Sequence, residues 1–240
     1  MNKLITQTAA QAVFTLILTI MTVGAARAQQ TIFNVPSSDV LDKGKVYLEL
    51  DASFRFNATR SVNRFSSFVP RGVFGIGSDT EVGVNITGNI NPGIDQTTIS
   101  PTIKHRLYHG KDNGVQVVVG DNAFIPVRNK SYNIGNYAYA QVSKTFKSNT
   151  RLTGGGYYFT KNVVAASARA GGQFGFEQTV NKYFNVIADY YTGRHAAGYF
   201  TPGVSFKASK RVTGYFGYSI GNSNPRTNNF FLGEIGINLN

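Results

Sequence analysis

Hydrophobic and polar residues alternate without interruption from Lys45 to Phe56. Val46, Leu48, Leu50, Ala52, Phe54 and Phe56 share one parity, and Lys45, Tyr47, Glu49, Asp51, Ser53 and Arg55 share the other. Because successive side chains of a strand point to opposite faces, this segment predicts a strand with one apolar and one charged face. Similar segments recur as far as the C-terminus, and a run of about ten alternating residues is typical of a strand in a transmembrane β-barrel.

The pattern predicts an all-β fold, a closed antiparallel up-and-down barrel of about 12 strands. The expected strands lie near 45–56, 65–77, 81–90, 96–107, 115–124, 136–146, 151–160, 169–178, 183–192, 199–207, 211–220 and 229–239. Short turns alternate with longer loops between them, as do the periplasmic turns and outer loops of outer-membrane barrels. A soluble exported β-sandwich is the alternative fold, since its strands also alternate.

Three prolines fall inside expected strands, namely Pro70, Pro101 and Pro202. Proline has no N–H to donate to a ladder and is usually found at edges and bulges. A closed barrel has no edge strand, so we expect bulges or missing ladder bonds at these positions.

The N-terminus is typical of a secretory signal over residues 1–28. Lys3 supplies the positive region, residues 13–23 the apolar region, and Ala26-Arg27-Ala28 a cleavage site between small residues. We therefore expect cleavage after residue 28, a short periplasmic segment over 29–44 and an outer-membrane barrel over 45–240. The chain has no cysteine, so its stability must come from packing and closure.

The chain resembles small porin-like and transporter barrels of the bacterial outer membrane, over roughly residues 45–240. The resemblance is carried by Val40-Leu41-Asp42-Lys43-Gly44-Lys45-Val46-Tyr47-Leu48-Glu49-Leu50 and by Ser78-Asp79-Thr80-Glu81-Val82-Gly83. It implies a Gram-negative-type outer membrane, passage of small solutes and insertion by the outer-membrane assembly machinery. Such barrels commonly end in an aromatic residue, whereas this chain ends Ile237-Asn238-Leu239-Asn240.

The inward parity carries nearly balanced charge, which we expect to be paired or hydrated. Our candidates for a lumenal constriction are Glu49, Asp51, Arg71, Lys104, Arg106 and Glu234. Closure of the barrel would bring Glu49, Asp51, Arg71 and Glu234 into one cluster. Two interpretations stay open, a salt-bridged plug in a narrow barrel and a charged wall around a small water-filled channel.

The outer loops are basic. Their cationic residues are Arg60, Arg64, Arg128, Lys130, Lys161, Arg194 and Arg226. This rim could attract small anionic solutes to a pore, or it could contact the phosphates of lipopolysaccharide-type lipids. The loop 125–135 is our candidate to cap the mouth, and the scattered charges do not indicate a nucleic-acid partner.

Aromatic residues near strand ends predict the interfacial girdles of a membrane barrel. They include Phe56, Phe65, Tyr108, Tyr183, Tyr199 and Phe230.

The sequence carries no recognisable catalytic or metal motif, so we expect no enzyme activity, metal or cofactor. Its histidines are His105, His109 and His195, and none stands beside a nucleophile motif. The function that we expect is a porin-like channel for small solutes. The alternatives are a plugged structural or adhesive barrel that works through its loops, and a lipid-modifying barrel enzyme centred on His195.

Overall fold

A computed structural model describes residues 31–55, 65–87, 97–110, 112–128, 133–164, 168–223 and 229–239. All of its named elements are strands, joined in chain order. They are β1 (Val46–Arg55), β2 (Phe65–Gly77), β3 (Thr80–Thr87), β4 (Thr98–Gly110), β5 (Val115–Pro126), β6 (Gly135–Thr145), β7 (Thr150–Phe159), β8 (Ala170–Thr179), β9 (Phe184–Tyr191), β10 (Tyr199–Lys207), β11 (Val212–Gly221) and β12 (Asn229–Asn238).

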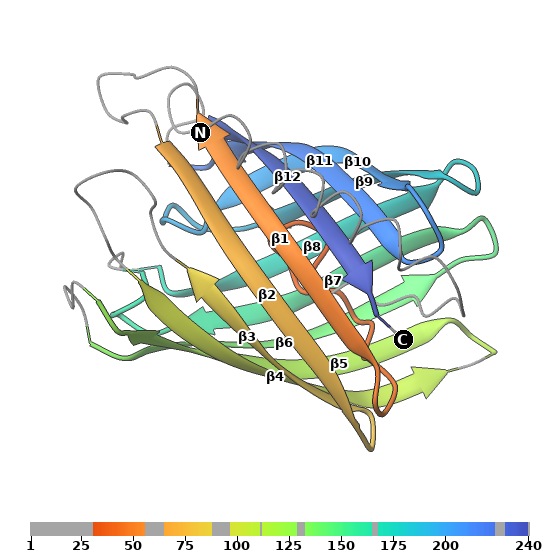
Figure 1. The fold of residues 1–240 in the computed structure, drawn as a ribbon, viewed down its shortest axis with the longest axis horizontal. Coiled ribbons are helices and arrows are strands. Elements are labelled where there is room, and N and C mark those ends of the chain that lie inside the picture. Colours follow the sequence, from red (N-terminus) through yellow and green to blue (C-terminus); the bar gives the residue numbers. More distant parts are fainter. Residues whose placement is uncertain are drawn as a thin grey trace, which may run out of the picture.

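Each strand pairs antiparallel with its neighbours in sequence, and β1 pairs with β12 to close the barrel. Figure 1 shows β1 between β2 and β12, with the strands running obliquely around the barrel. The prediction of a closed 12-stranded antiparallel barrel is confirmed. We call the end with the connections 78–79, 146–149, 180–183 and 208–211 the turn side, and the opposite end the loop side.

The two faces of the wall differ as the alternation predicted. Outward residues such as Leu50, Ile103 and Ile235 are 44%, 47% and 53% exposed, while the inward Glu49 and Asp51 are 4% and 8% exposed. Soluble monomers rarely expose a continuous apolar band of this extent, whereas a membrane barrel presents one to lipid. The apolar exterior is therefore the lipid-facing surface.

The substitution Leu50→Arg tests this orientation, because it places a charge at the middle of β1 on the apolar face. It should destabilise the barrel in lipid vesicles by about 2–4 kcal/mol, the cost of Arg near the bilayer midplane. The matched control is Val46→Arg, on the same face at the end of the same strand, where the cost should be about 0–1 kcal/mol. Equal losses of unfolding free energy for the two variants would show that the face does not meet lipid.

The strand prolines interrupt their ladders, as expected. The β4–β5 pairing passes from Ile99 to Thr102 and skips Pro101, and the β10–β11 pairing passes from Phe200 to Gly203 and skips Pro202. The β2–β3 pairing begins at Arg71, immediately after Pro70. The bulges lie elsewhere, between Gly75 and Gly77 and between Arg106 and Tyr108.

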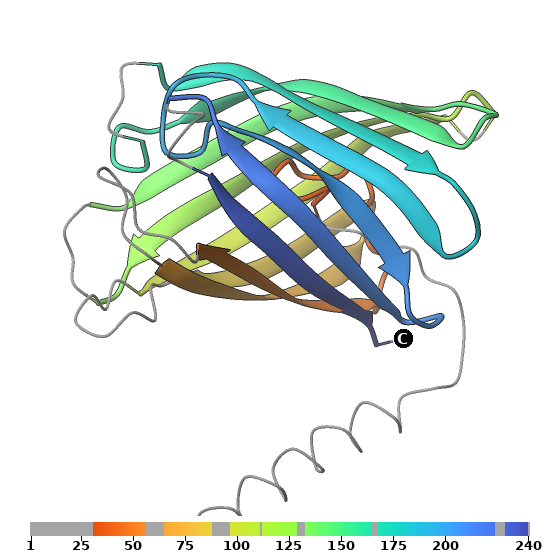
Figure 2. The same cartoon turned by 90° about the horizontal axis from the view of Figure 1, so that it is seen from above.

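The position of the N-terminal segment corrects one expectation. We placed residues 29–44 in the periplasm, ahead of the barrel. The described part, from Thr31, instead runs inside the barrel, where residues from Ile32 to Leu41 are mostly buried. Its red-to-orange trace lies between the strands in both Figure 1 and Figure 2. The segment lies there because the lumen offers it apolar surface and hydrogen-bond acceptors.

The predicted signal peptide, residues 1–28, lies outside the described residues. Among those that are described, no helix is long and apolar enough to cross a membrane.

Candidate functional site in the barrel lumen

Residues 31–41, which we call the N-terminal plug, cross the lumen as a folded turn. Thr31 and Pro36 form an isolated bridge, and the Ile32 N–H donates to the Val35 carbonyl over 2.8 Å. Ile32, Phe33 and Val35 are at most 2% exposed. A segment with so little solvent contact is a packed part of the barrel interior.

One carboxylate on the wall holds the turn of the plug. Asp189, on β9, accepts the consecutive backbone N–H groups of Phe33, Asn34 and Val35 on its Oδ2, at 3.0, 2.5 and 2.7 Å. The Asn34 side chain also donates to Thr201 Oγ1 over 3.1 Å. Hydrogen bonds to an ionised acceptor are stronger than neutral ones, and successive backbone N–H groups form a cradle for an anion. Asp189 is therefore the main polar attachment of the plug.

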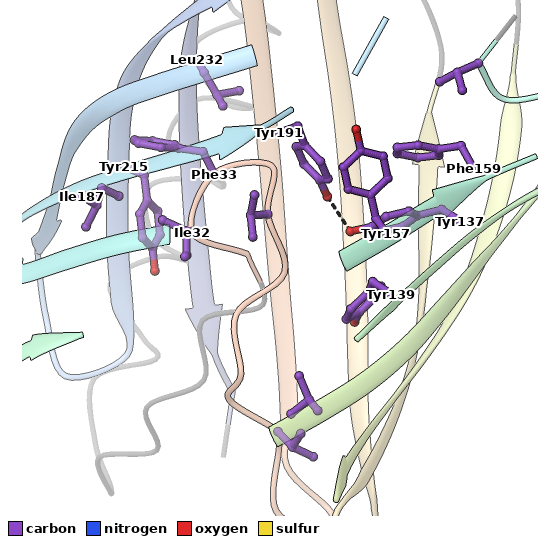
Figure 3. Close-up of a cluster of buried hydrophobic side chains, with 14 residues drawn as sticks. Ile32, Phe33, Tyr137, Tyr139, Tyr157, Phe159, Ile187, Tyr191, Tyr215 and Leu232 are labelled. Atoms are coloured by element: carbon purple, nitrogen blue, oxygen red, sulfur yellow. Dashed lines mark hydrogen bonds between the residues drawn. The ribbon is translucent and has the colours of Figure 1, made fainter. Parts of the chain in front are cut away.

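Glycines occupy the inner face of the wall where the large side chains of the plug pack. A Cβ atom at Gly203 or Gly217 would lie 2.5 or 2.8 Å from the Phe33 ring, and one at Gly175 would lie 2.0 Å from Ile32. At Gly217 the Phe33 ring is the nearest neighbour of such an atom, whereas at Gly203 the Phe216 carbonyl oxygen, 2.2 Å away, already excludes a side chain. Figure 3 shows Ile32 and Phe33 among Ile187, Tyr215 and Leu232 of the wall. The lumen is shaped to receive the plug.

An aromatic cluster occupies the loop side of the lumen. Tyr137, Tyr157, Phe159 and Tyr191 are all at most 5% exposed. The Tyr137 hydroxyl donates to Gln173 Oε1 over 2.6 Å and lies 2.6 Å from the Tyr191 hydroxyl, the contact drawn in Figure 3. This cluster was not predicted from the sequence. The local indication of this cluster in the sequence is the run Tyr157-Tyr158-Phe159. This run is apolar on both parities because both the lumen and the exterior are apolar at this end of the barrel.

Four of the six constriction candidates come together beside the plug. Arg71 Nη1 lies 2.5 Å from Glu49 Oε1 and Arg71 Nη2 lies 3.1 Å from Asp51 Oδ2. Glu234 is the register partner of Asp51 across the β1–β12 closure. Arg71 Nη1 also donates to Thr31 Oγ1 over 2.9 Å, so the cluster contacts the plug.

The other two candidates lie apart from that cluster. Lys104 Nζ pairs with Glu81 Oε1 over 2.9 Å, and Glu81 Oε2 accepts the Leu41 N–H over 2.7 Å. Arg106 instead pairs with Asp79 in the β2–β3 turn, where the Asp79 side chain is 53% exposed. Lys104 thus borders the plug, and Arg106 belongs to the turn-side rim.

Arg151 is a lumenal residue that sequence analysis missed. It pairs with Asp39 of the plug over 2.8 Å, and its Nη2 donates to Glu177 Oε1 over 2.9 Å. We began the seventh strand at Arg151 without assigning its side chain to the lumen. Its register partner in β8 is Glu177, and directly opposed residues point to the same face.

A cavity of about 620 Å³ lies between the plug and the turn-side end of the barrel, where it opens. We call it the vestibule. Its charged lining residues are Arg151, Lys182, Lys207 and Lys210 against Asp39 and Glu177. Four cationic residues against two acids give the vestibule an excess of positive charge.

Only part of the predicted basic rim lies within the described residues. Arg128, Lys161 and Arg194 are exposed on the loop side, while Arg60, Arg64, Lys130 and Arg226 lie outside. In the loop 125–135, residues 129–132 are also outside, so its capping role stays a prediction. Of the expected girdle residues, Tyr108 and Tyr183 are exposed at strand ends, whereas Phe56 and the side chain of Phe65 are not described.

His195, in the loop between β9 and β10, is buried against the aromatic cluster. Its Nε2 lies 2.8 Å from the Tyr157 hydroxyl, and its Nδ1 accepts the Ala197 N–H over 3.2 Å. Burial lowers the pKa of His195 below its ordinary value, which favours the neutral ring at physiological pH. These contacts make His195 part of the packing of the loop side.

No family model and no curated protein matches the chain. The COG4313 outer membrane channel from Pseudomonas putida F1 is similar with a TM-score of 0.49 and 9% identity, over 84% of this chain and 97% of that one. Outer membrane phospholipase A from Escherichia coli has a TM-score of 0.47 and 14% identity, over 84% and 94% of the two chains. OprG from Pseudomonas aeruginosa has a TM-score of 0.20 and 9% identity, over 83% and 99%.

A channel and an enzyme stand at the same level of similarity, so these likenesses do not choose between the two activities. The architecture is shown by the structure itself, which has a closed ladder, an apolar exterior and a charged interior. These are the features of bacterial outer-membrane β-barrels, and the expected resemblance to that class is confirmed at the level of the fold.

Proposed function

We propose that this protein is an outer-membrane channel for small solutes, anionic ones among them, and that its N-terminal plug is the gate. The observation that carries the proposal is that a folded segment of the chain fills the lumen. A barrel whose interior admits a peptide turn with a phenylalanine is wide enough for small solutes once that turn has moved.

The closed state should dominate at rest. Burying a large apolar side chain contributes roughly 1.5–3 kcal/mol, and Ile32, Phe33 and Val35 are all buried. Several polar contacts add to this, among them Lys104 to the Ser37 carbonyl at 3.3 Å. Opening therefore requires a voltage, a partner or another force that pulls the plug toward the turn side.

The charge of the vestibule supports anions as the preferred solutes. Its lysines border the turn-side opening of the lumen, which a solute crosses once the plug has moved, and a basic lining raises the local concentration of anions. The exposed Arg128, Lys161 and Arg194 form a second basic surface, on the loop side, which we assign to the phosphates of outer-leaflet lipids.

Anion preference should fall when Lys182, Lys207 and Lys210 are all replaced by glutamine in a barrel that lacks residues 31–40. Reversal potentials under a salt gradient would measure it, because each lost charge weakens the attraction at the entrance. The control replaces Arg128, Lys161 and Arg194 by glutamine in the same background. If the control loses as much anion preference, the loop-side rim selects the solute and the vestibule does not.

The second candidate is a permanently plugged barrel with a structural or adhesive role. The fit of Phe33 against Gly203 and Gly217 favours it, because close packing holds a segment in one place. Solute entry into proteoliposomes separates the two functions. The full-length barrel should admit small organic anions under an applied membrane potential if the plug is a gate, whereas entry only after deletion of residues 31–40 would favour the structural role.

A further inference from the structure

Three carboxylates converge within the wall beside the plug. Glu49 and Asp51 come from β1 and Glu234 from β12, and one oxygen of each lies within 4.8 Å of the others. The three residues are 4%, 8% and 2% exposed. Asp51 and Glu234 are directly opposed in the register, so closure of the barrel creates this grouping.

Hydrogen bonds account for only part of the oxygen atoms in this group. Arg71 contacts Glu49 Oε1 and Asp51 Oδ2, and the Tyr47 hydroxyl donates to Glu49 Oε2 over 2.5 Å. Asp51 Oδ1 and both oxygens of Glu234 are buried without a hydrogen-bond partner among the described residues. Glu234 is thus a deeply buried carboxylate turned toward two others with no donor to satisfy it.

Such an arrangement lacks positive charge. When all three carboxylates are ionised, they carry three negative charges, against the one positive charge of the guanidinium that contacts Glu49 and Asp51. An ionised carboxylate without a partner is very costly in a low-dielectric interior. A divalent cation between the orphan oxygens would neutralise the remaining two charges and supply the missing partner for Glu234.

We propose that Glu49, Asp51 and Glu234 form a binding site for a hard divalent cation, Ca²⁺ or Mg²⁺. All of the ligand atoms are carboxylate oxygens, which these ions prefer, whereas zinc and copper favour nitrogen or sulfur ligands. The bound ion ties the first strand to the last at the closure of the barrel. It also lies beside Arg71, which contacts Thr31 of the plug.

The vestibule gives the cation a route to the site. Tyr215 and Asn238 line the vestibule. Tyr215 is the register partner of Glu234, and Asn238 is the register partner of Tyr47. Tyr215 and Asn238 therefore connect the vestibule lining to the strand positions next to the carboxylates.

Equilibrium binding of ⁴⁵Ca²⁺ to the detergent-extracted full chain tests the site, with Mg²⁺ as competitor. We expect one ion per chain for the wild type, loss of that ion in Glu234→Gln, and retention in the control Glu177→Gln, another lumenal carboxylate outside the group. EDTA should lower the melting temperature of the wild type and leave that of Glu234→Gln unchanged. Absence of binding to the wild type, or equal binding to Glu234→Gln, would overturn the proposal and indicate that protons neutralise the group.

A second measurement covers the case in which Glu234→Gln does not fold. Terbium replaces Ca²⁺ in oxygen sites, and Tyr47 and Tyr215 lie close enough to sensitise its luminescence. The wild type should give Tb³⁺ emission that Ca²⁺ displaces, and Asp51→Asn should weaken it. No displaceable emission would overturn the proposal. Both measurements report ion binding alone, so their outcome is independent of whether the barrel conducts solutes.

Discussion

Deleting residues 31–40 should turn a barrel that is silent at low voltage into one that shows discrete conductance steps at the same voltage in a planar bilayer. The wall closes through its own ladder, from β1 to β12, and needs no residue of the plug to do so. The deletion removes the side chains that fill the middle of the lumen and releases Asp189, Arg151 and Lys104 from their contacts with the plug. A polar passage with charged walls should remain, which is the condition for ion conduction.

A graded variant separates gating from damage to the barrel. Asp189→Ala leaves the plug in place but removes the acceptor of three of its N–H groups. It should give brief, infrequent openings, between the silence of the wild type and the activity of the deletion. Heat-modifiable migration in gels would show that each variant is folded. A folded deletion variant without conductance would contradict the gating role of the plug.

The second large effect is expected for Arg71→Met. This change leaves Glu49, Asp51 and Glu234 buried without the guanidinium that pairs with two of them. Removing one partner of a buried ion pair typically costs about 3–5 kcal/mol, because the remaining charge is uncompensated. Urea unfolding of the barrel in lipid vesicles would measure the loss of unfolding free energy.

Arg106→Met is the matched control, since it makes the same substitution at an arginine whose partner, Asp79, is 53% exposed. Exposed ion pairs typically contribute about 0–1 kcal/mol, so this variant should be nearly as stable as the wild type. Adding Glu49→Gln and Asp51→Asn to Arg71→Met should restore much of the loss, because the two carboxylates that paired with Arg71 are then neutral and only Glu234 remains. Equal losses for Arg71→Met and Arg106→Met would contradict the account of the cluster.

Sequence alone predicted the wall closely, because lipid on one side and polar groups on the other impose a period of two residues. Strand β2 was predicted over 65–77 and is observed over Phe65–Gly77, and β10 was predicted over 199–207 and is observed over Tyr199–Lys207. The same alternation placed Glu49 and Asp51 on the inner face. Closure of an even-numbered barrel then placed Glu234 beside them.

The contents of the lumen were not predictable in the same way. The plug has no periodic pattern, since Ile32, Phe33 and Val35 are buried by a turn that three N–H groups and one distant carboxylate stabilise. A contact between residues about 155 positions apart leaves no local trace in the chain. Tyr137 and Tyr191 were missed for a related reason, because part of this lumen is apolar and breaks the rule that inward residues are polar.

The most direct test of the gate is a reversible lock between the plug and the wall. Ser38 of the plug and Ser143 of β6 contact each other through their hydroxyl groups in the lumen, and the chain has no native cysteine. Cysteines at these two positions should form a disulfide, because their sulfur atoms would lie within bonding reach. We predict that the oxidised Ser38→Cys, Ser143→Cys barrel stays closed at every voltage, and that reduction allows voltage-driven openings in the same bilayer. Identical conductance before and after reduction would contradict the claim that the N-terminal plug gates the lumen.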